Sequence, residues 1–231
     1  MHKPLNLLLR QIHKKALILV LALSVFQFSA NSRQKETGTI KTALLIVDIQ
    51  NFYFPGDGPG LVNAESASLN AREILEIFRE KNQLVVHVRH KSEKGFEIHK
   101  NVEPLSGEKV ITKEEVNSFR NTDLLDFLKA GNISRLIIIG MQTHMCLEAA
   151  VRAGNDYGFE CIVIHDACAT RDLKFNGKIV KAEDVHFSTL ATIAGGGYGK
   201  VIDLKTFKEH KDKYLLQKLD WQSVRIRITT R

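Results

Sequence analysis

The chain has 231 residues, of which 44% are hydrophobic and 26% are charged, and this balance is typical of a globular protein with one sizeable core. It excludes a chain made mainly of disordered or low-complexity sequence. The formal net charge of +7 is concentrated towards the two ends, and no nucleic-acid-binding motif accompanies it, so we expect no nucleic-acid partner.

Residues 1–32 have the order of a secretory signal peptide. Four basic residues and no acidic residue precede the apolar run 16–28, and small or polar residues follow it. This run is shorter than the roughly 20 residues that a spanning helix needs, so we expect cleavage after Ala30 or Ser32 and no stable membrane insertion afterwards. The prediction is an exported protein, periplasmic or secreted. An uncleaved anchor and a buried N-terminal helix are the alternatives.

The part after a polar linker, residues 33–40, alternates between strand-like and helix-like segments. Continuous apolar runs predict strands that are buried on both faces, as in a parallel sheet, at residues 43–47, 84–88, 136–139 and 162–164, with a short edge at 201–202. Apolar residues at helical spacing predict helices over 63–81 and 122–130, the second of which ends at Gly131.

This alternation predicts a Rossmann-like fold for residues 41–204, a doubly wound three-layer α/β sandwich around a mostly parallel sheet. The remaining residues, 205–231, hold eight Lys or Arg against three Asp or Glu, and we interpret them as a basic, solvated C-terminal extension. Functional groups of such a sheet belong at the carboxyl ends of its strands, where the strand order reverses.

Two polar residues are predicted at the carboxyl ends of strands. Asp48 directly follows the first predicted strand, and a buried carboxylate is costly unless it is paired or reaches a ligand. Lys113 follows the short apolar pair at 110–111 and could also end a strand. The alternatives without a functional role are that Asp48 caps a turn and that Lys113 is a solvated surface residue.

Cys146 follows the run 136–139, just inside the predicted start of a helix. Thr143 could cap that helix, and Glu148 and Arg152 have the spacing of an i, i+4 pair. The helix start would favour thiolate over thiol, which suggests a nucleophile, whereas a buried core cysteine is the alternative. Cys161 and Cys168 lie at opposite ends of one apolar run, too far apart for a disulfide, so we expect all three thiols to be free.

Together these segments resemble the isochorismatase-like cysteine hydrolases. The resemblance covers residues 41–203 and rests on four motifs in order: LLIVDIQNFYFPG, VITKEEVNSF, GMQTHMCLEAAVRA and GFECIVIHDACAT. It implies a catalytic triad with Cys146 as nucleophile, Asp48 as base and Lys113 as the residue that holds the aspartate. It also implies an oxyanion hole formed by the backbone N–H groups of Gln142 and Cys146, after a cis peptide bond between Met141 and Gln142.

The activity implied by the resemblance is hydrolysis of a C–N bond in a small amide or ureido compound, through an acyl-enzyme and without a cofactor. Nicotinamidase-like members bind a metal through histidines after the first strand, but no histidine lies between Asp48 and His87, so we expect no metal. Isochorismatases that cleave vinyl ethers lack the cysteine. A hydrolase of another bond, such as a vinyl ether, and a non-catalytic, redox-responsive thiol protein are the alternatives.

Several further residues are candidates for the site. His87 and His90 have an odd separation, which on a strand predicts opposite faces and not a metal pair. Aromatic residues next to Asp48 could line a substrate pocket or belong to the core, and the pocket set that we expect is Phe52, Phe54, Phe119 and His144. We also expect a homo-oligomer.

Overall fold

The computed structural model describes residues 40–56 and 60–215. The predicted signal peptide, most of the predicted linker and residues 216–231 of the basic extension lie outside these ranges. In the described part of the chain, none of the helices combines the length and the apolar character needed to cross a membrane.

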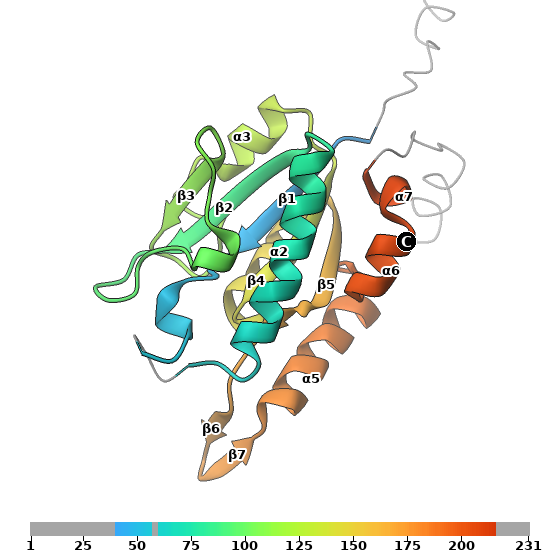
Figure 1. Cartoon of the computed structure of the whole chain (residues 1–231). Coiled ribbons are helices and arrows are strands. Elements are labelled where there is room, and N and C mark those ends of the chain that lie inside the picture. Colours follow the sequence, from blue (N-terminus) through green and yellow to red (C-terminus); the bar gives the residue numbers. More distant parts are fainter. Residues whose placement is uncertain (1–39, 57–59, 216–231) are drawn as a thin grey trace, which may run out of the picture. The chain divides into compact units, whose positions relative to one another are not determined.

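Six parallel strands of the described residues form the central sheet, in the order β3-β2-β1-β4-β5-β8 (Figure 1). The strands are β1 (Thr42–Val47), β2 (Leu84–His90), β3 (Lys109–Lys113), β4 (Arg135–Met141), β5 (Glu160–Ala169) and β8 (Lys200–Ile202). Every residue of β1 and β4 is buried, as their continuous apolar runs predict. The order in which successive strands are added to the sheet reverses between β1 and β4. The strands β2 and β3 lie on one side of β1, and the later strands lie on the other.

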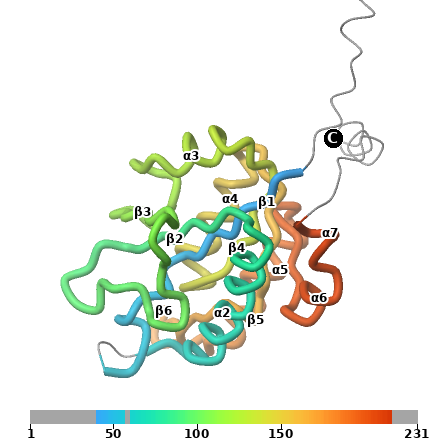
Figure 2. Tube along the Cα trace, turned by 45° about the horizontal axis from the view of Figure 1, so that its top comes forward, coloured from blue at the N-terminus to red at the C-terminus, as the bar shows by residue number. Residues whose placement is uncertain are grey.

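Helices cover both faces of the sheet. The helix α2 (Ala64–Glu80) packs on the face of β1 that carries Leu44 and Ile46. The opposite face, with Leu45 and Val47, packs against α3 (Leu124–Ala130), α4 (Glu148–Asp156) and α5 (Ala182–Gly195). Figure 2 shows α3 and α4 above the strands and α2 below them. The predicted three-layer α/β sandwich is therefore confirmed.

The start of the predicted basic extension differs from our expectation. Residues 205–215 belong to α6 (Leu204–Glu209) and α7 (Lys211–Leu215), and Phe207, Tyr214 and Leu215 are buried in the core on the α2 face. The hydroxyl of Thr42 in β1 donates a hydrogen bond to the carbonyl of Tyr214 at 2.8 Å. Three apolar side chains among many lysines are enough to anchor this segment, so the expectation of a solvated tail is wrong for residues 205–215.

Short elements complete the described fold. Three single turns are η1 (Asn51–Tyr53), η2 (Lys100–Val102) and η3 (Thr143–Leu147). An antiparallel hairpin of β6 (Leu173–Phe175) and β7 (Lys178–Val180) lies between β5 and α5 and pairs with no strand of the central sheet. Neither this hairpin nor α5 was predicted from the sequence.

Candidate active site

Four neighbouring strands bring one polar side chain each to the carboxyl edge of the sheet. Asp48 follows β1, His90 ends β2, Lys113 ends β3, and Cys146 lies in η3, directly after β4. His90 and Lys113 are partners in the parallel ladder, so their side chains leave the sheet side by side. The four residues meet at the point where the strand order reverses, which is where α/β sheets bind ligands.

Lys113 is the centre of this cluster. Its ammonium lies 2.8 Å from Oδ2 of Asp48, and both side chains are fully buried. The same ammonium donates to Sγ of Cys146 at 3.3 Å and lies 3.0 Å from Nδ1 of His90. The structure therefore brings together the three residues that the sequence predicts for a triad, and it adds His90 as a fourth.

The backbone around the cluster is constrained at two positions. Asp48 has a φ of +52°, which is unusual for a residue other than glycine, and its N–H donates to the carbonyl of Val88 at 2.9 Å. Gly140 has a φ of +132°, and a Cβ there would lie 2.0 Å from the carbonyl oxygen of Val47. Only glycine fits between β4 and β1 at this point. The peptide bond between Met141 and Gln142 is cis, as predicted.

Cys146 lies in η3, a π-helical turn that leads into α4. Such turns are rare and occur frequently at functional sites. Thr143 does not cap the turn: its hydroxyl instead donates to the carbonyl of Ala169 at 3.2 Å and lies 2.9 Å from Nδ1 of His186. The predicted N-cap is wrong because the wider turn directs Thr143 towards β5 and α5. The predicted pair of Glu148 and Arg152 is confirmed, at 2.7 Å.

Burial sets the protonation of the cluster. Burial, followed by the nearby Asp48 carboxylate, raises the pKa of the Cys146 thiol to about 12. The resting sulfur is therefore protonated at neutral pH, which corrects the expectation that the helix start favours a thiolate. Burial also raises the pKa of Asp48, against the opposing effect of Lys113. A buried carboxylate next to a neutral thiol is well suited to accept the proton of that thiol.

The cluster also has the side chains that could bind a metal. Asp48, His90 and Cys146 are the one group of three metal-ligating residues in the described part of the chain, and their ligand atoms lie within 4.8 Å of one another. The ammonium of Lys113 contacts all three side chains. The position of a shared cation is therefore already taken by a positive charge. His87 belongs to a different cluster, because its Nε2 lies 2.9 Å from Glu108, as the odd spacing of the two histidines predicts.

Two of the four predicted pocket residues lie on the segments that carry Asp48 and Cys146. Phe52, half-buried in η1, packs edge-on against Tyr53 at 4.2 Å between ring centroids. The hydroxyl of Tyr53 accepts a hydrogen bond from Nε2 of Gln142 at 3.3 Å. His144, half-buried in η3, has its Nδ1 2.6 Å from the hydroxyl of Thr170.

The other two predicted pocket residues lie in the core. Phe54 is buried on the α2 face and stacks on His99 at 3.7 Å between centroids. Phe119 packs against Tyr157 and Phe159, which precede β5 and so lie at the amino edge of the sheet. The structure does not bring Phe119 to the cluster.

Sequence reasoning missed a buried residue that fixes the cluster. Gln50 holds the backbone of His90 in two places, since its Nε2 donates to the carbonyl at 3.0 Å and its Oε1 accepts from the N–H at 2.7 Å. The same Nε2 donates to the carbonyl of Phe96 at 2.7 Å. A glutamine two residues after Asp48 at a strand end was the available signal, but its partners are 40 and 46 residues away in the sequence.

The fold and the cluster define the class of protein: a doubly wound α/β protein with a buried thiol, ammonium and carboxylate at the switch point of the sheet. Comparison with known families agrees with this class. The family model of the isochorismatase domain matches residues 42–194, and the chain belongs to this family of hydrolases.

Individual relatives cover most of the same region. The chain is 43% identical over 165 residues to YddQ, an isochorismatase family protein of Bacillus subtilis, a match that covers 67% of this chain and 92% of YddQ. It is similar, with a TM-score of 0.68 and 39% identity, to the crystal structure of a protein from Oleispira antarctica that is classed with the isochorismatase hydrolases; the match covers 72% and 95% of the two chains. It is 28% identical over 130 residues to the ureidoacrylate amidohydrolase RutB of Yersinia enterocolitica, over 54% of this chain and 56% of RutB.

Proposed function

We propose that this hydrolase cleaves a C–N bond of a small amide or ureido compound, with Cys146 as the nucleophile. The observation that carries the proposal is the single ammonium of Lys113, which contacts both the sulfur of Cys146 and the carboxylate of Asp48. A nucleophile, a base and a fixed positive charge are the groups that acyl transfer requires. Similarity to an amidohydrolase, RutB, supports the same bond type.

The proposed reaction begins with the neutral thiol. As the sulfur of Cys146 attacks the substrate carbonyl carbon, its proton passes to Asp48, and the carbonyl oxygen becomes an oxyanion. The backbone N–H groups of Gln142 and Cys146 would hold this oxyanion. The C–N bond then breaks, the proton on Asp48 passes to the leaving nitrogen, and a thioester remains on Cys146.

Water completes the cycle. Asp48, again ionised, takes a proton from a water molecule that attacks the thioester, and the same proton returns to the sulfur as the acid leaves. Lys113 keeps its charge throughout and stabilises the carboxylate form of Asp48 in a buried site. The cycle needs only the protein's own groups and water.

The two alternative functions receive less support. A redox-responsive thiol is typically accessible to solvent and has a lowered pKa, whereas Cys146 is buried and burial raises its pKa to about 12. All three cysteines are free, as predicted. A hydrolase of vinyl ethers would not need a sulfur in contact with an ammonium and close to a base.

The proposal is tested by ammonia release from a panel of small amides, ureides and carbamoyl compounds, with a vinyl ether as a separate arm. We expect wild-type protein to release ammonia from at least one amide or ureide, and Cys146→Ala and Asp48→Asn to lower kcat by roughly 10³-fold or more. Cys161→Ala is the matched control, because that buried cysteine lies at the amino end of β5, away from the cluster. Ammonia release that survives Cys146→Ala, or turnover of the vinyl ether alone, contradicts the proposal.

A further inference from the structure

Thr143 begins the turn η3 and directly follows Gln142, whose backbone N–H would form part of the proposed oxyanion hole. Two contacts hold its buried hydroxyl. The hydroxyl donates to the carbonyl of Ala169 at the end of β5, at 3.2 Å, and it lies 2.9 Å from Nδ1 of His186 in α5. Within the turn, the carbonyl of Gln142 accepts from two backbone N–H groups, at 3.0 and 3.4 Å. The start of η3 is therefore tied to both β5 and α5 through one side chain.

The two contacts of Thr143 fix which nitrogen of His186 carries the proton. Burial, followed by repulsion from His165, lowers the pKa of His186 to about 4, so the ring is neutral at pH 7 and has a single N–H. The hydroxyl of Thr143 also has a single proton, and the carbonyl of Ala169 can only accept it. The second contact then needs a donor on the ring. Nδ1 therefore carries the proton and donates to Oγ1 of Thr143.

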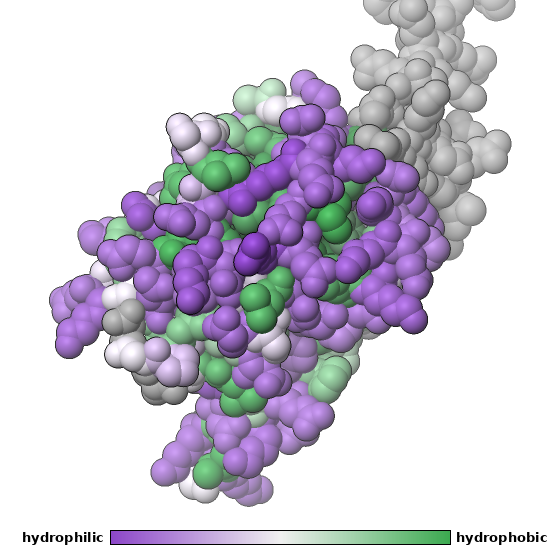
Figure 3. Space-filling view, viewed as in Figure 1, coloured by the Kyte–Doolittle hydropathy of each residue, from purple (hydrophilic) through white to green (hydrophobic). Residues whose placement is uncertain are grey.

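The other ring nitrogen of His186, Nε2, is left as an acceptor with no hydrogen-bond partner among residues 40–56 and 60–215. His186 lines a cavity of about 480 Å³ between the end of β5 and the first turns of α2 and α5. Polar and apolar residues share this lining, and the face of the domain in Figure 3 is also mainly hydrophilic, with scattered hydrophobic residues. A cavity of this size and polarity admits water, which can donate to Nε2. The inferred tautomer thus satisfies both nitrogens of the ring.

We propose that His186 is a positioning residue, which holds η3 in the geometry that the oxyanion hole requires. Its Nδ1–H fixes Thr143, and Thr143 fixes the adjacent backbone of Gln142 at the start of the turn that carries Cys146. Oxyanion donors must lie within about 0.5 Å of their productive positions, so a tether at this point affects the reaction. In the described part of the chain, His186 makes no hydrogen bond to the predicted triad, so it acts through Thr143. The inference rests on the proposed function, since it concerns the same oxyanion hole.

The first test compares two replacements of His186 in the full chain. His186→Leu removes the donor, whereas His186→Asn places an amide N–H close to the position of Nδ1. We expect His186→Leu to lower kcat for ammonia release by roughly tenfold or more with little change in KM, because the oxyanion forms only in the transition state. His186→Asn should recover most of this loss. His165→Leu is the control and should leave kcat unchanged, because His165 lines the same cavity and packs edge-on against His186 but does not bond to Thr143.

A double variant separates positioning from a general structural role. Thr143→Val removes the hydroxyl with little change in shape. If His186 acts through that hydroxyl, His186→Leu should cost little further kcat in the Thr143→Val background. Urea unfolding of each variant gives the comparison. A merely structural role would lower the free energy of unfolding but leave kcat of the folded protein unchanged.

Two measurements need no substrate, so they distinguish a failure of this inference from a failure of the proposed function. Nitrogen-15 NMR of the histidine rings should show that His186 is protonated on Nδ1 at pH 7. Hydrogen exchange of the η3 amides should be roughly tenfold faster in His186→Leu and near the wild-type rate in His186→Asn. These results without hydrolysis of any amide or ureide would reject the proposed function and still support His186 as the residue that positions η3.

Four outcomes would overturn the inference. The first is a proton on Nε2 of His186 in the wild-type protein. The second is wild-type kcat or wild-type exchange of η3 in folded His186→Leu. The others are a failure of His186→Asn to recover activity and a fully additive loss of kcat in the double variant with Thr143→Val.

Discussion

The ammonium of Lys113 has three neighbours, and the third, His90, is the one whose role the sequence does not reveal. Burial, followed by the charge of Lys113, lowers the pKa of His90, while Asp48 and Glu114 oppose this shift. The ring is therefore neutral at pH 7, and its Nδ1 can accept a hydrogen bond from the ammonium, 3.0 Å away. We infer that His90 is a positioning residue, which directs Lys113 towards Asp48 and Cys146.

Replacement of His90 tests this role. His90→Leu removes the acceptor, and because a hydrogen bond to a charged group contributes about 1.5–3 kcal/mol, we expect kcat/KM for ammonia release to fall roughly tenfold to a hundredfold. His90→Gln keeps an acceptor and should retain more activity. The pH profile separates a positioning role from a merely structural one. Protonation of His90 would place a second positive charge beside Lys113 and disturb its position, whereas a structural role would not depend on this protonation.

The sign of the pH effect follows from the lowered pKa. Wild-type activity should decrease as the pH falls through the pKa of His90, which lies below 6.5, whereas His90→Gln should lack this decrease. The measurement is kcat/KM between pH 4.5 and 8 for both proteins. Identical acid limbs in the two profiles would show that His90 does not titrate in the active form.

For single residues, the sequence predicts which side chains form the site better than it predicts their protonation and their partners. Asp48, Lys113 and Cys146 are identifiable because each follows an apolar run, or because the motifs resemble a known family. The neutral thiol of Cys146 was not predictable, since it depends on burial by residues from several strands. Gln50 was missed, and His90 was considered only as a possible metal ligand, because the partners of both residues are distant in the sequence.

Among the elements, β4 has the strictest local requirement. Gly140 lies opposite Val47 where the register between β4 and β5 shifts, and it precedes the cis peptide and η3. A side chain there would collide with backbone atoms of β1, which cannot move without disturbing the sheet. The turn that carries Cys146 therefore depends on this glycine.

We expect Gly140→Ala to destabilise the protein by about 3 kcal/mol or more, because it combines a backbone clash with a positive φ. Gly107→Ala is the matched control: Gly107 also has a positive φ, +93°, but an added Cβ would meet nothing within 4 Å. That change should cost about 1–2 kcal/mol. Urea unfolding measures both, and equal losses of stability would show that the clash at Gly140 is relieved at little cost.

The helices and strands that can be predicted from the sequence are those with a regular pattern of apolar residues along the chain. The strands β1, β2, β4 and β5 follow from continuous apolar runs, and α2 and α3 from helical spacing. The helix α5 was missed because its apolar and small residues are not confined to one side of the helix. The hairpin was missed although Asn176-Gly177 is a recognisable turn signal, because its two strands are only three residues long, too short to show an alternating pattern.

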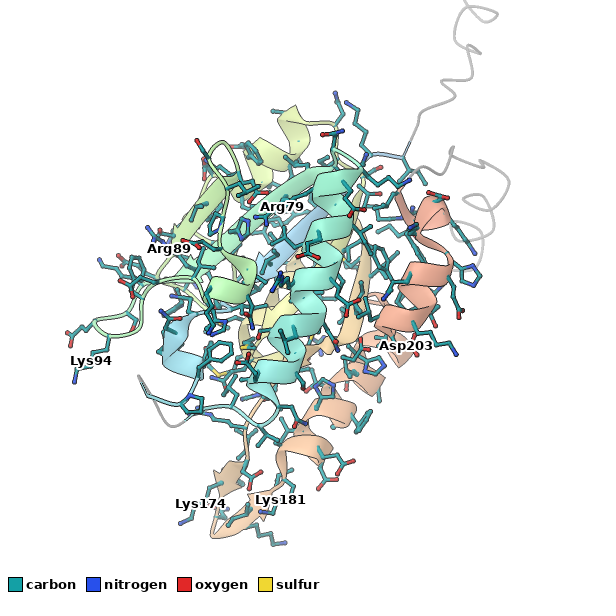
Figure 4. All side chains as sticks on the ribbon, viewed as in Figure 1. Arg79, Arg89, Lys94, Lys174, Lys181 and Asp203 are labelled. Carbon is teal, nitrogen blue, oxygen red and sulfur yellow. The ribbon has the colours of Figure 1, made fainter. Side chains whose placement is uncertain are left out.

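Across the whole domain, a partly buried ion cluster links α2, β2 and the loop before β3. Both carboxylate oxygens of Glu108 lie 2.8 Å from nitrogens of Arg79, and Oε2 also accepts from the N–H of Leu105 and contacts His87 (Figure 4 labels Arg79). Burial opposes ionisation, but these hydrogen bonds lower the pKa of Glu108 to about 2. The hydrogen bonds of this cluster join its members to one another and to the backbone of Glu103 and Leu105, and none goes to Asp48, Lys113 or Cys146, so we assign it a role in stability.

The lowered pKa of Glu108 predicts an acid-dependent loss of stability. The folded pKa is about 2 and the ordinary value is 4.5, so the contribution of Glu108 is complete above pH 4.5, decreases as the pH falls, and is absent below about pH 2. We expect Glu108→Gln to cost about 2–3 kcal/mol at pH 7. The difference in unfolding free energy between the two proteins should shrink from pH 5 to pH 2. A difference that is constant with pH would contradict the assignment.

The most direct measurement is the mass of the Cys146 peptide during turnover. Wild-type protein is mixed with the amide or ureide that releases ammonia fastest, quenched in acid within the first turnovers, digested and analysed by mass spectrometry. We predict that the Cys146 peptide gains the mass of the substrate's acyl group, that the peptides of Cys161 and Cys168 are unmodified, and that Cys146→Ala shows no adduct. Ammonia release at the wild-type rate from Cys146→Ala, or an acyl group found on another residue, would contradict it.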